Sequence, residues 1–262
     1  MQKIEKEELK QKLLKAEKIL VGIGEEFEEP DFLEKQPCYT ELGQDIRKAK
    51  MQWIMPYIHG KLLKEDTGLS NALTALGELL KDKDYFVISV CMNGKLKEAG
   101  LDPERVVEPC GSYENMQCIA GCAGSVSASD EKLLTETETY LLGKKSWDQM
   151  ELPACPICGK SMVFNNLYAE HYLEEGYSPN WKNYTDWLQD TVNRELCILE
   201  LGAGMLFAGI HRFRFEKIVG LNNKSSLVRI HEKLYQIPEE IADRSVGIAQ
   251  NAVEFMAQMK EV

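Results

Sequence analysis

The chain has 262 residues, of which 44% are hydrophobic and 28% charged, as in an ordinary globular protein. This length is sufficient for one large domain, or for one domain that carries a small module. The net charge of −11 argues against a general nucleic-acid binder, because such a protein needs a basic surface to displace counterions. No stretch approaches the roughly 18 apolar residues that a membrane-spanning helix needs. We therefore expect neither a nucleic-acid nor a membrane partner.

Short apolar segments alternate along the chain with segments whose apolar residues have helical spacing. The pattern predicts helices over residues 4–20, 69–80 and 249–259. It predicts strands over residues 19–21, 85–90, 105–108, 196–201, 217–221 and 245–248. Continuous apolar strands that alternate with helices are typical of an α/β fold with a Rossmann-like, mostly parallel sheet covered by helices on both faces.

Residues 118–190 interrupt this alternation, because the segment is polar, rich in aromatic residues and contains two pairs of cysteines. Cys155 and Cys158 have the spacing of a zinc knuckle, and the pair Cys118 and Cys122 is one residue wider. The spacing predicts a zinc-ribbon module. Four thiolates leave no coordination position open for water, so the zinc ion is expected to be structural.

A disulfide framework is the alternative interpretation of these cysteines. Residues 1–18 form a charged stretch rather than the apolar core of a secretory signal, which favours a reducing compartment and a cytoplasmic location. Zinc is therefore the preferred interpretation. The expected organisation is a zinc-binding module at 118–190, inserted into a Rossmann-like domain formed by residues 1–117 and 191–262.

Ligands of parallel α/β sheets bind beyond the carboxyl ends of the strands, so the residues that follow each predicted strand carry most weight. Glycine, cysteine and asparagine predominate at these positions. They occur in Gly22-Ile23-Gly24, Cys91-Met92-Asn93-Gly94, Pro109-Cys110-Gly111, Gly202-Ala203-Gly204 and Asn222-Asn223. A glycine turn that leads into a helix presents backbone amides that can bind a pyrophosphate.

The order of these segments resembles that of the sirtuins, a family of NAD-dependent deacylases and ADP-ribosyltransferases, over nearly the whole chain. Gly22-Ile23-Gly24 is similar to the sirtuin Gly-Ala-Gly turn, and Pro30-Asp31-Phe32 to the Pro-Asp-Phe-Arg motif. Residues 89–94 resemble the Thr-Gln-Asn-Ile-Asp stretch, and residues 107–112 the segment with the catalytic His-Gly. The cysteine pairs follow in the family's order, and Gly202-Ala203-Gly204 stands where sirtuins have Gly-Thr-Ser.

Three short sequence segments resemble the bacterial macrodomain-linked branch of the family most closely. They are Leu101-Asp102-Pro103-Glu104-Arg105, Met116-Gln117-Cys118 and Leu199-Glu200-Leu201-Gly202-Ala203-Gly204. The catalytic histidine is also replaced in that branch. The resemblance therefore implies protein ADP-ribosylation rather than deacylation.

The resemblance implies NAD as a nucleotide ligand and a protein or acyl-lysine side chain as substrate. The implied cofactor-binding residues are Gly22, Gly24, Cys91, Gly202, Gly204 and Asn222. The resemblance places Asn93 and Cys110 nearest to the reacting sugar, as the candidate catalytic residues.

The candidate pocket departs from the family's pattern at each of its chemical positions. Cys110 replaces the general-base histidine, Cys91 the ribose-binding asparagine and Asn93 the nicotinamide-binding aspartate, while Leu33 replaces the arginine of Pro-Asp-Phe-Arg. A thiol with a pKa near roughly 8.5 is a poor base at neutral pH. The two cysteines are interpreted as small buried hydrophobes, with a reactive thiol, or for Cys110 a metal ligand, as the alternatives.

Glu25 and Glu26 stand directly after the first glycine turn. A carboxylate close to a pyrophosphate charge opposes binding by about 4 kcal/mol at an effective dielectric constant near 20. These acids either point to solvent and interact with the helix dipole, or select a cationic or neutral ligand, or occupy the anion slot themselves. Arg212 and Arg214 are candidates for positive charge near Gly204.

Other residues carry less information. The four histidines are scattered, none at metal-ligand spacing from another, so we expect surface or hydrogen-bonded core residues. Trp181, Tyr184 and Trp187 have helical spacing, which favours core packing. Residues 165–168 either line a peptide groove or form an exposed polar turn.

Two functions follow from these observations. The first is a divergent NAD-dependent transferase that carries out ADP-ribosyl transfer or deacylation and contains a structural zinc ion. The alternative is a catalytically silent protein of the same fold that binds a nucleotide or a partner. The sequence indicates neither the acceptor nor the oligomeric state.

Overall fold

The computed structural model describes residues 7–261, except residues 8, 10, 14, 37 and 38. The helix predicted over 4–20 therefore lies partly outside the described residues. Within that range Leu9 and Leu13 are buried in the core, and the chain enters a strand at Lys18. In the part of the chain that the structure describes, no helix has both the length and the apolar character needed to cross a membrane.

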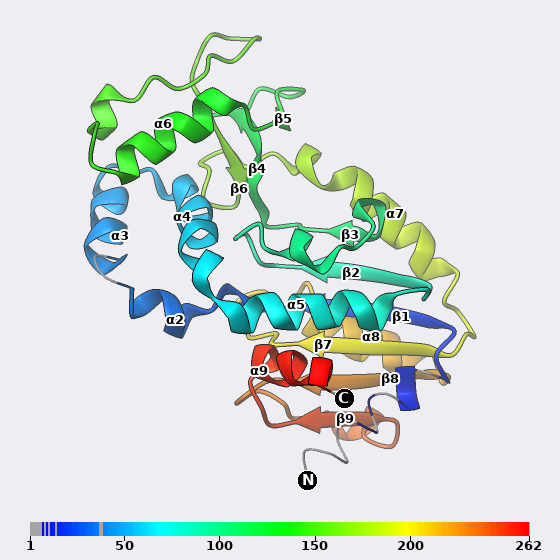
Figure 1. The fold of residues 1–262 in the computed structure, drawn as a ribbon. Coiled ribbons are helices and arrows are strands. Elements are labelled where there is room, and N and C mark those ends of the chain that lie inside the picture. The colour runs from blue at the N-terminus through cyan, green and yellow to red at the C-terminus, as the bar shows by residue number, and fades with distance from the viewer. Residues whose placement is uncertain (1–6, 8, 10, 14, 37–38, 262) are drawn as a thin grey trace.

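A six-stranded sheet forms the centre of the larger domain (Figure 1). Its strand order is β3-β2-β1-β7-β8-β9, and every neighbouring pair is parallel. The strands are β1 (Lys18–Ile23), β2 (Tyr85–Ser89), β3 (Val106–Val107), β7 (Leu196–Leu201), β8 (Ser225–Ile230) and β9 (Ser245–Ile248). The strands β1 and β2 are mostly apolar because both faces of the sheet are covered, while β7 and β8 each contain one charged residue, Glu200 and Arg229. The predicted α/β class is confirmed.

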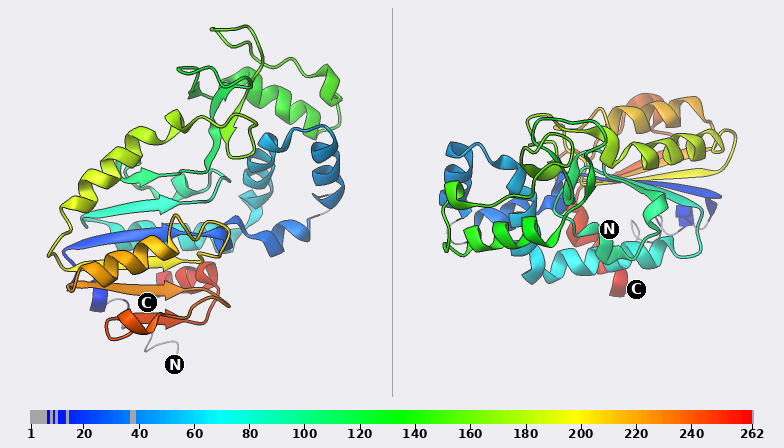
Figure 2. Two further views of the ribbon diagram at one scale, coloured as in Figure 1. Left: turned by 180° about the vertical axis from the view of Figure 1, so that it is seen from behind. Right: turned by 90° about the horizontal axis from the view of Figure 1, so that it is seen from above.

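Helices cover both faces of this sheet, as the view from above in Figure 2 shows. They are α5 (Thr67–Leu80) and α9 (Ala252–Ala257) on one face, and α7 (Ser178–Gln189) and α8 (Arg212–Leu221) on the other. Leu76 and Phe255 are buried on the first face, and Tyr184, Trp187 and Phe215 on the second. Burial of each such side chain stabilises the fold by about 1.5–3 kcal/mol. The expected packing role of Tyr184 and Trp187 is confirmed.

The strand predicted over residues 217–221 is wrong. These residues form the second half of α8, and the fifth strand of the large sheet in chain order is β8. Phe215 and Val219 lie four residues apart, so both project from one helical face into the core. A short apolar run has the same composition in a buried helix and in a buried strand, and composition alone does not separate them. The fifth strand therefore ends at Ile230 and not at Leu221.

A smaller lobe forms around a three-stranded antiparallel sheet with the order β5-β4-β6. Its strands are β4 (Gly111–Cys118), β5 (Ser127–Ala128) and β6 (Met162–Asn166), and its helices are α3 (Tyr39–Lys48), α4 (Met55–Leu62) and α6 (Glu131–Leu141). The short helix α2 (Pro30–Glu34) leads from the larger domain into α3. Trp53, Tyr57, Leu133 and Phe164 share one buried cluster, which joins α4 to the cysteine-containing segment. Two segments distant in the sequence therefore build this lobe (Figure 1).

Helix α7 falls inside the predicted module of residues 118–190, yet it packs on the large sheet. Tyr184 and Trp187 contact the same apolar cluster as Phe86 of β2. The helix is thus a layer of the larger domain. The domain boundaries at 117 and 190 themselves stay a prediction.

Candidate nucleotide site and metal centre

The structure brings the four predicted metal ligands together in the smaller lobe. The sulfur atoms that lie within 4.8 Å of one another belong to Cys118, Cys122, Cys155 and Cys158. Two knuckle amides point at these sulfurs: Ala120 donates to Cys118 and Ile157 to Cys155, each at 3.4 Å. Gly159 closes the second knuckle with a φ of +75°, a conformation that favours glycine.

This donor set fits a structural zinc ion. Four cysteine sulfurs within reach of one ion match tetrahedral coordination, and amide donors to sulfur favour the thiolate form. Cys110 does not join the group, because it packs with Val90 and Met92 in a separate apolar cluster. The expectation of a possible zinc site is confirmed, and the role of Cys110 as an alternative ligand is wrong.

We expect one zinc ion per chain, lost in Cys155→Ser together with a clear fall in melting temperature, because two antiparallel strands converge on the metal. Cys197→Ala is the matched control, since Cys197 is buried in β7, outside the cluster. Elemental mass spectrometry and thermal denaturation measure the two effects. Full zinc occupancy in Cys155→Ser would contradict the assignment.

The metal lobe is joined directly to the edge of the large sheet at Cys110. The amide of Leu167, just after β6, donates to the carbonyl of Cys110 at 3.0 Å. Gly111 pairs with Asn166, and a Cβ atom at Gly111 would overlap the backbone of Asn165. The side chain of Asn166 is buried and donates to the carbonyl of Trp53 at 2.9 Å. Asn165 and Asn166 therefore hold the lobe together instead of forming an exposed turn.

Two glycine turns meet at the carboxyl ends of β1 and β7. The amide of Gly24 donates to Leu201 O and that of Gly202 to Ile230 O, both at 2.8 Å. A Cβ atom on Gly24 would overlap the backbone of Ala203, so the close approach of the turns requires glycine. Gly22 is needed for the packing of α8 on the sheet, because a Cβ atom at this position would overlap the ring of Phe215, a residue of that helix.

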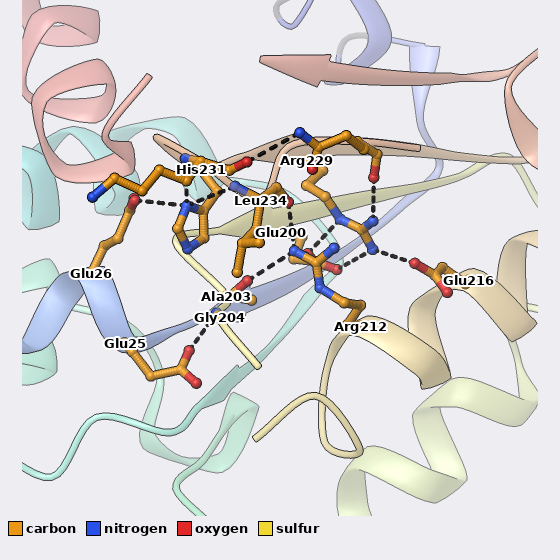
Figure 3. A network of polar contacts seen from close by, with 12 residues as sticks. Glu25, Glu26, Glu200, Ala203, Gly204, Arg212, Glu216, Arg229, His231 and Leu234 are labelled. Carbon is orange, nitrogen blue, oxygen red and sulfur yellow. Dashed lines mark hydrogen bonds and ion pairs between the residues drawn. The ribbon is translucent and has the colours of Figure 1, made fainter. Parts of the chain in front are cut away.

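Glu25 occupies the anion-binding position of the second glycine turn. It lies in a short 3₁₀ helix, η1 (Glu25–Glu28), directly after Gly24. Its carboxylate accepts a hydrogen bond from the amide of Gly204 at 2.6 Å (Figure 3). It also accepts one from the amide of Phe207 at 3.2 Å. Of the interpretations offered by the sequence, the structure supports an acid that occupies the anion slot itself. The amides of this turn can bind an anion, and here the carboxylate of Glu25 from the same chain is the anion that they bind.

Glu26 connects the ends of β8 and β9. Its carboxylate accepts from the amides of Glu232 at 2.9 Å and Ala252 at 2.7 Å, and lies 3.0 Å from Nδ1 of His231. Burial raises the pKa of Glu26, and the two amides oppose that shift. Glu26 therefore does not point to solvent.

A buried ion network lies beneath the Gly202 turn (Figure 3). Arg229 donates to Glu200 at 2.6 and 3.1 Å and to Glu216 at 2.8 Å, and the side chains of Arg229 and Glu200 are 1% and 0% exposed. Arg212 donates to Ala203 O at 3.1 Å, which places a positive charge beside the turn as the sequence suggested. Arg214 instead lies over the ring of Trp181.

Glu200→Gln should lower the free energy of unfolding by roughly 3 kcal/mol, because it removes the main counter-charge of a buried guanidinium. Glu216→Gln is the matched control. Its side chain is 24% exposed, so its loss should cost about 1 kcal/mol or less. Urea unfolding at pH 7 measures both. Equal effects would show that the network is not centred on Glu200.

The candidate catalytic and ribose-binding residues are engaged inside the protein. The thiol of Cys91 donates to Gly24 O at 3.2 Å, and the amide of Asn93 donates to Phe27 O at 2.9 Å. Cys110 is fully buried among apolar side chains. Burial raises the pKa of both thiols, so thiolate is scarce at neutral pH. Both cysteines are small buried hydrophobes here.

Alkylation of the folded, zinc-loaded protein by iodoacetamide at pH 7.5 should therefore leave Cys91 and Cys110 unmodified. The reagent attacks the thiolate, and both burial and the raised pKa suppress it. Peptide mass spectrometry, with the urea-unfolded protein as the positive control, gives the extent at each position. Rapid labelling of Cys110 in the folded state would show that it faces the crevice as a reactive group.

Asn222 does not lie at the crevice. Its amide donates to the carbonyls of Thr191 at 3.1 Å and Arg194 at 3.3 Å, at the amino-terminal edge of the sheet. The residue that follows β8 at the carboxyl edge is His231. The sequence interpretation missed His231 because it placed the strand at residues 217–221, which belong to α8. The apolar residues Leu227, Val228 and Ile230 are the signal that identifies β8.

A second histidine missed by the sequence interpretation belongs to a polar chain behind the crevice. Glu28 accepts from the amide of Met92, and its other oxygen lies 3.3 Å from Nδ1 of His59. Nε2 of His59 lies 2.8 Å from the hydroxyl of Tyr39. The negative charge of Glu28 contributes to the raised pKa of Cys110, so the chain lies near that thiol.

Comparison with known proteins relates this geometry to one fold. No family model matches the chain. It is 23% identical over 239 residues to the "Protein ADP-ribosyltransferase" of Staphylococcus aureus, a match that covers 87% of this chain and 74% of that protein. It is 25% identical over 141 residues to a "Probable bifunctional ADP-ribose hydrolase/ADP-ribosyltransferase" of Fusarium oxysporum f. sp. cubense. That match covers 52% of this chain but 24% of the fungal protein.

Solved structures with the same fold are sirtuins. The structure of Sir2Tm bound to a propionylated peptide superposes with a TM-score of 0.58 and 15% identity, over 97% of both chains. The Sir2-p53 peptide-NAD+ structure gives a TM-score of 0.57 and 16% identity, over 97% of this chain and 96% of the other. The predicted sirtuin-like fold is confirmed.

Proposed function

We propose that this divergent sirtuin-like protein binds NAD at the carboxyl edge of its large sheet and transfers ADP-ribose to a protein acceptor. One observation carries the proposal. The amides of Gly204 and Phe207 converge on the carboxylate of Glu25, so the turn after β7 is built to hold an anion. The relationship to the staphylococcal protein ADP-ribosyltransferase over most of the chain supports the same activity.

The residues present fit the phosphate-binding half of NAD. The carboxylate oxygens of Glu25 stand in for phosphate oxygens, and a Cβ atom on Gly204 would lie 3.2 Å from that carboxylate, so glycine leaves room for an anion there. When bound, NAD supplies an ADP-ribosyl group joined to a nicotinamide leaving group. Glu25 must leave the amides before a phosphate takes its place, because the two anions compete for the same donors.

The apolar setting of Cys110 favours transfer over deacylation. A buried thiol with a raised pKa does not accept a proton at neutral pH, so Cys110 cannot serve as the general base. The hydrogen-bonded chain of Glu28, His59 and Tyr39 supplies titratable groups on the neighbouring side of the crevice. A protein acceptor supplies its own nucleophile. Transfer of ADP-ribose to it therefore depends less on a general base of the enzyme than removal of an acyl group from lysine does.

A second candidate function is a catalytically silent nucleotide sensor. The occupation of the anion site by Glu25 favours it, because an unliganded site closed by its own carboxylate changes conformation when a nucleotide binds. In this reading Cys110 and Cys91 complete the core and carry no chemistry.

Isothermal titration of the zinc-loaded protein with ADP-ribose and with NAD tests the proposal. Glu25→Ala should bind ADP-ribose at least about tenfold more tightly than the unmodified chain, since it removes a competing charge from the slot. Glu239→Ala, at an exposed acid far along the chain, changes the net charge equally and should change nothing. Equal affinities for all three proteins would refute the role of Glu25.

Incubation with labelled NAD separates the two candidate functions. Label transferred to the protein or to an added acceptor, by a chain that binds NAD, supports the transferase. Binding without transfer in both the unmodified chain and Glu25→Ala supports the silent sensor. No binding by either protein up to millimolar ligand contradicts both.

A further inference from the structure

A cavity of about 490 Å³ lies outside the crevice, beside the edge strand β3 where the large and small sheets meet. Its walls come from the turn before β3, the start of β4, the end of β6 and the start of α7. They include Lys97, Glu108, Ser112, Asn165, Tyr177 and Asn180. This volume is in the range of small-molecule sites. Neither Gly204 nor Cys110 lines it, so the cavity is distinct from the proposed nucleotide site.

Glu108 is the feature of this cavity that points to a ligand. Among the described residues no side chain or backbone amide forms a hydrogen bond or ion pair with its carboxylate, although its backbone carbonyl accepts from Gly111. The cationic lining residue is Lys97, and its ammonium is directed to Glu114 at 2.9 Å. The Glu108 side chain is half-buried in the cavity wall, and a carboxylate in such a setting without a partner is costly, unless a ligand supplies the missing charge or hydrogen bonds.

Asn180 helps to keep the cavity open. Its amide donates to the carbonyls of Pro103 at 2.9 Å and Val106 at 2.7 Å, which fixes α7 against the edge of β3. On the opposite wall Asn165 donates to Gln117 at 2.6 Å and to Leu173 O at 2.9 Å. Both walls are thus braced by side-chain hydrogen bonds from Asn165 and Asn180.

We propose that this cavity binds an organic cation, with a guanidinium or primary ammonium group paired to the carboxylate of Glu108. A divalent metal ion fits poorly, because it needs about six oxygen ligands, and Glu114 is already paired with Lys97. The cation belongs either to a free amine or to a lysine or arginine side chain of a protein. The site does not depend on the proposed transferase activity.

The titration of Glu108 gives the site a specific signature. Burial, with contributions from the charges of Glu114 and Glu28, raises the pKa of Glu108 to about 8, and the Lys97 ammonium opposes the shift. At pH 7 the carboxyl is therefore mostly protonated. A cation that pairs with the ionised form must release that proton, so its affinity rises with pH up to about 8 and then levels off.

Titration calorimetry with agmatine, at pH 6, 7 and 8 and in two buffers of different ionisation enthalpy, tests the proposal. We expect saturable binding, proton release at pH 7 and an affinity at pH 8 several-fold above that at pH 6. N,N′-Diacetylputrescine, in which both amines are acylated and which therefore carries no charge, should not bind. An arginine-containing peptide that binds more tightly than agmatine identifies a protein side chain as the source, and the reverse order identifies a free amine.

Glu108→Gln should abolish both binding and proton release, while Glu104→Gln, at an exposed acid in the turn before β3, should retain them. Glu108→Gln is expected to fold, because it removes a group whose ionised form destabilises the native state above the ordinary carboxyl pKa. Its melting temperature at pH 8 should be equal to or higher than that of the unmodified chain. Agmatine binding that survives in Glu108→Gln, or no binding of any cation by the unmodified chain, overturns the proposal.

Discussion

The contact of the Glu25 carboxylate with the amides of Gly204 and Phe207 connects most of what is particular to this molecule. It requires two glycine turns at adjacent strand ends, because any side chain on Gly24 would separate them. It also requires a parallel sheet, which brings the ends of β1 and β7 to the same edge. The turn after β7 thereby has the geometry of an anion-binding site, and the chain itself fills it.

Three fully or partly buried carboxylates of this protein fall into two groups according to what surrounds them. Glu200 is fully buried, but Arg229 donates two hydrogen bonds to it, and Glu26 accepts from two backbone amides. Glu108 has no such donor among the described residues, so burial shifts its pKa upward to about 8. The first group stabilises the fold around the turns. The second indicates a position where a partner from outside is needed.

The candidate catalytic residues are part of the protein core. Cys110, which the sequence resemblance aligns with a histidine, is an apolar core residue, and the side chain of Asn93 is fixed by Phe27 O. The polar groups that remain near this edge are His59, linked to Glu28, and His231, beside Glu26. Under the proposed transfer reaction, catalysis would depend on positioning and backbone donors more than on a general base.

The sequence by itself determined the α/β class and the four cysteines of the metal centre, because these follow from apolar periodicity and local spacing. The sirtuin-like fold was indicated by the resemblance of the motifs and of their order. It misplaced the strand before His231, since residues 217–221 have the composition of either a helix or a strand. Only the tertiary structure decided that Glu25 occupies the anion site and that Glu108 stands unpaired. Those outcomes depend on which distant segments meet at the sheet edges, and a linear pattern does not contain that information.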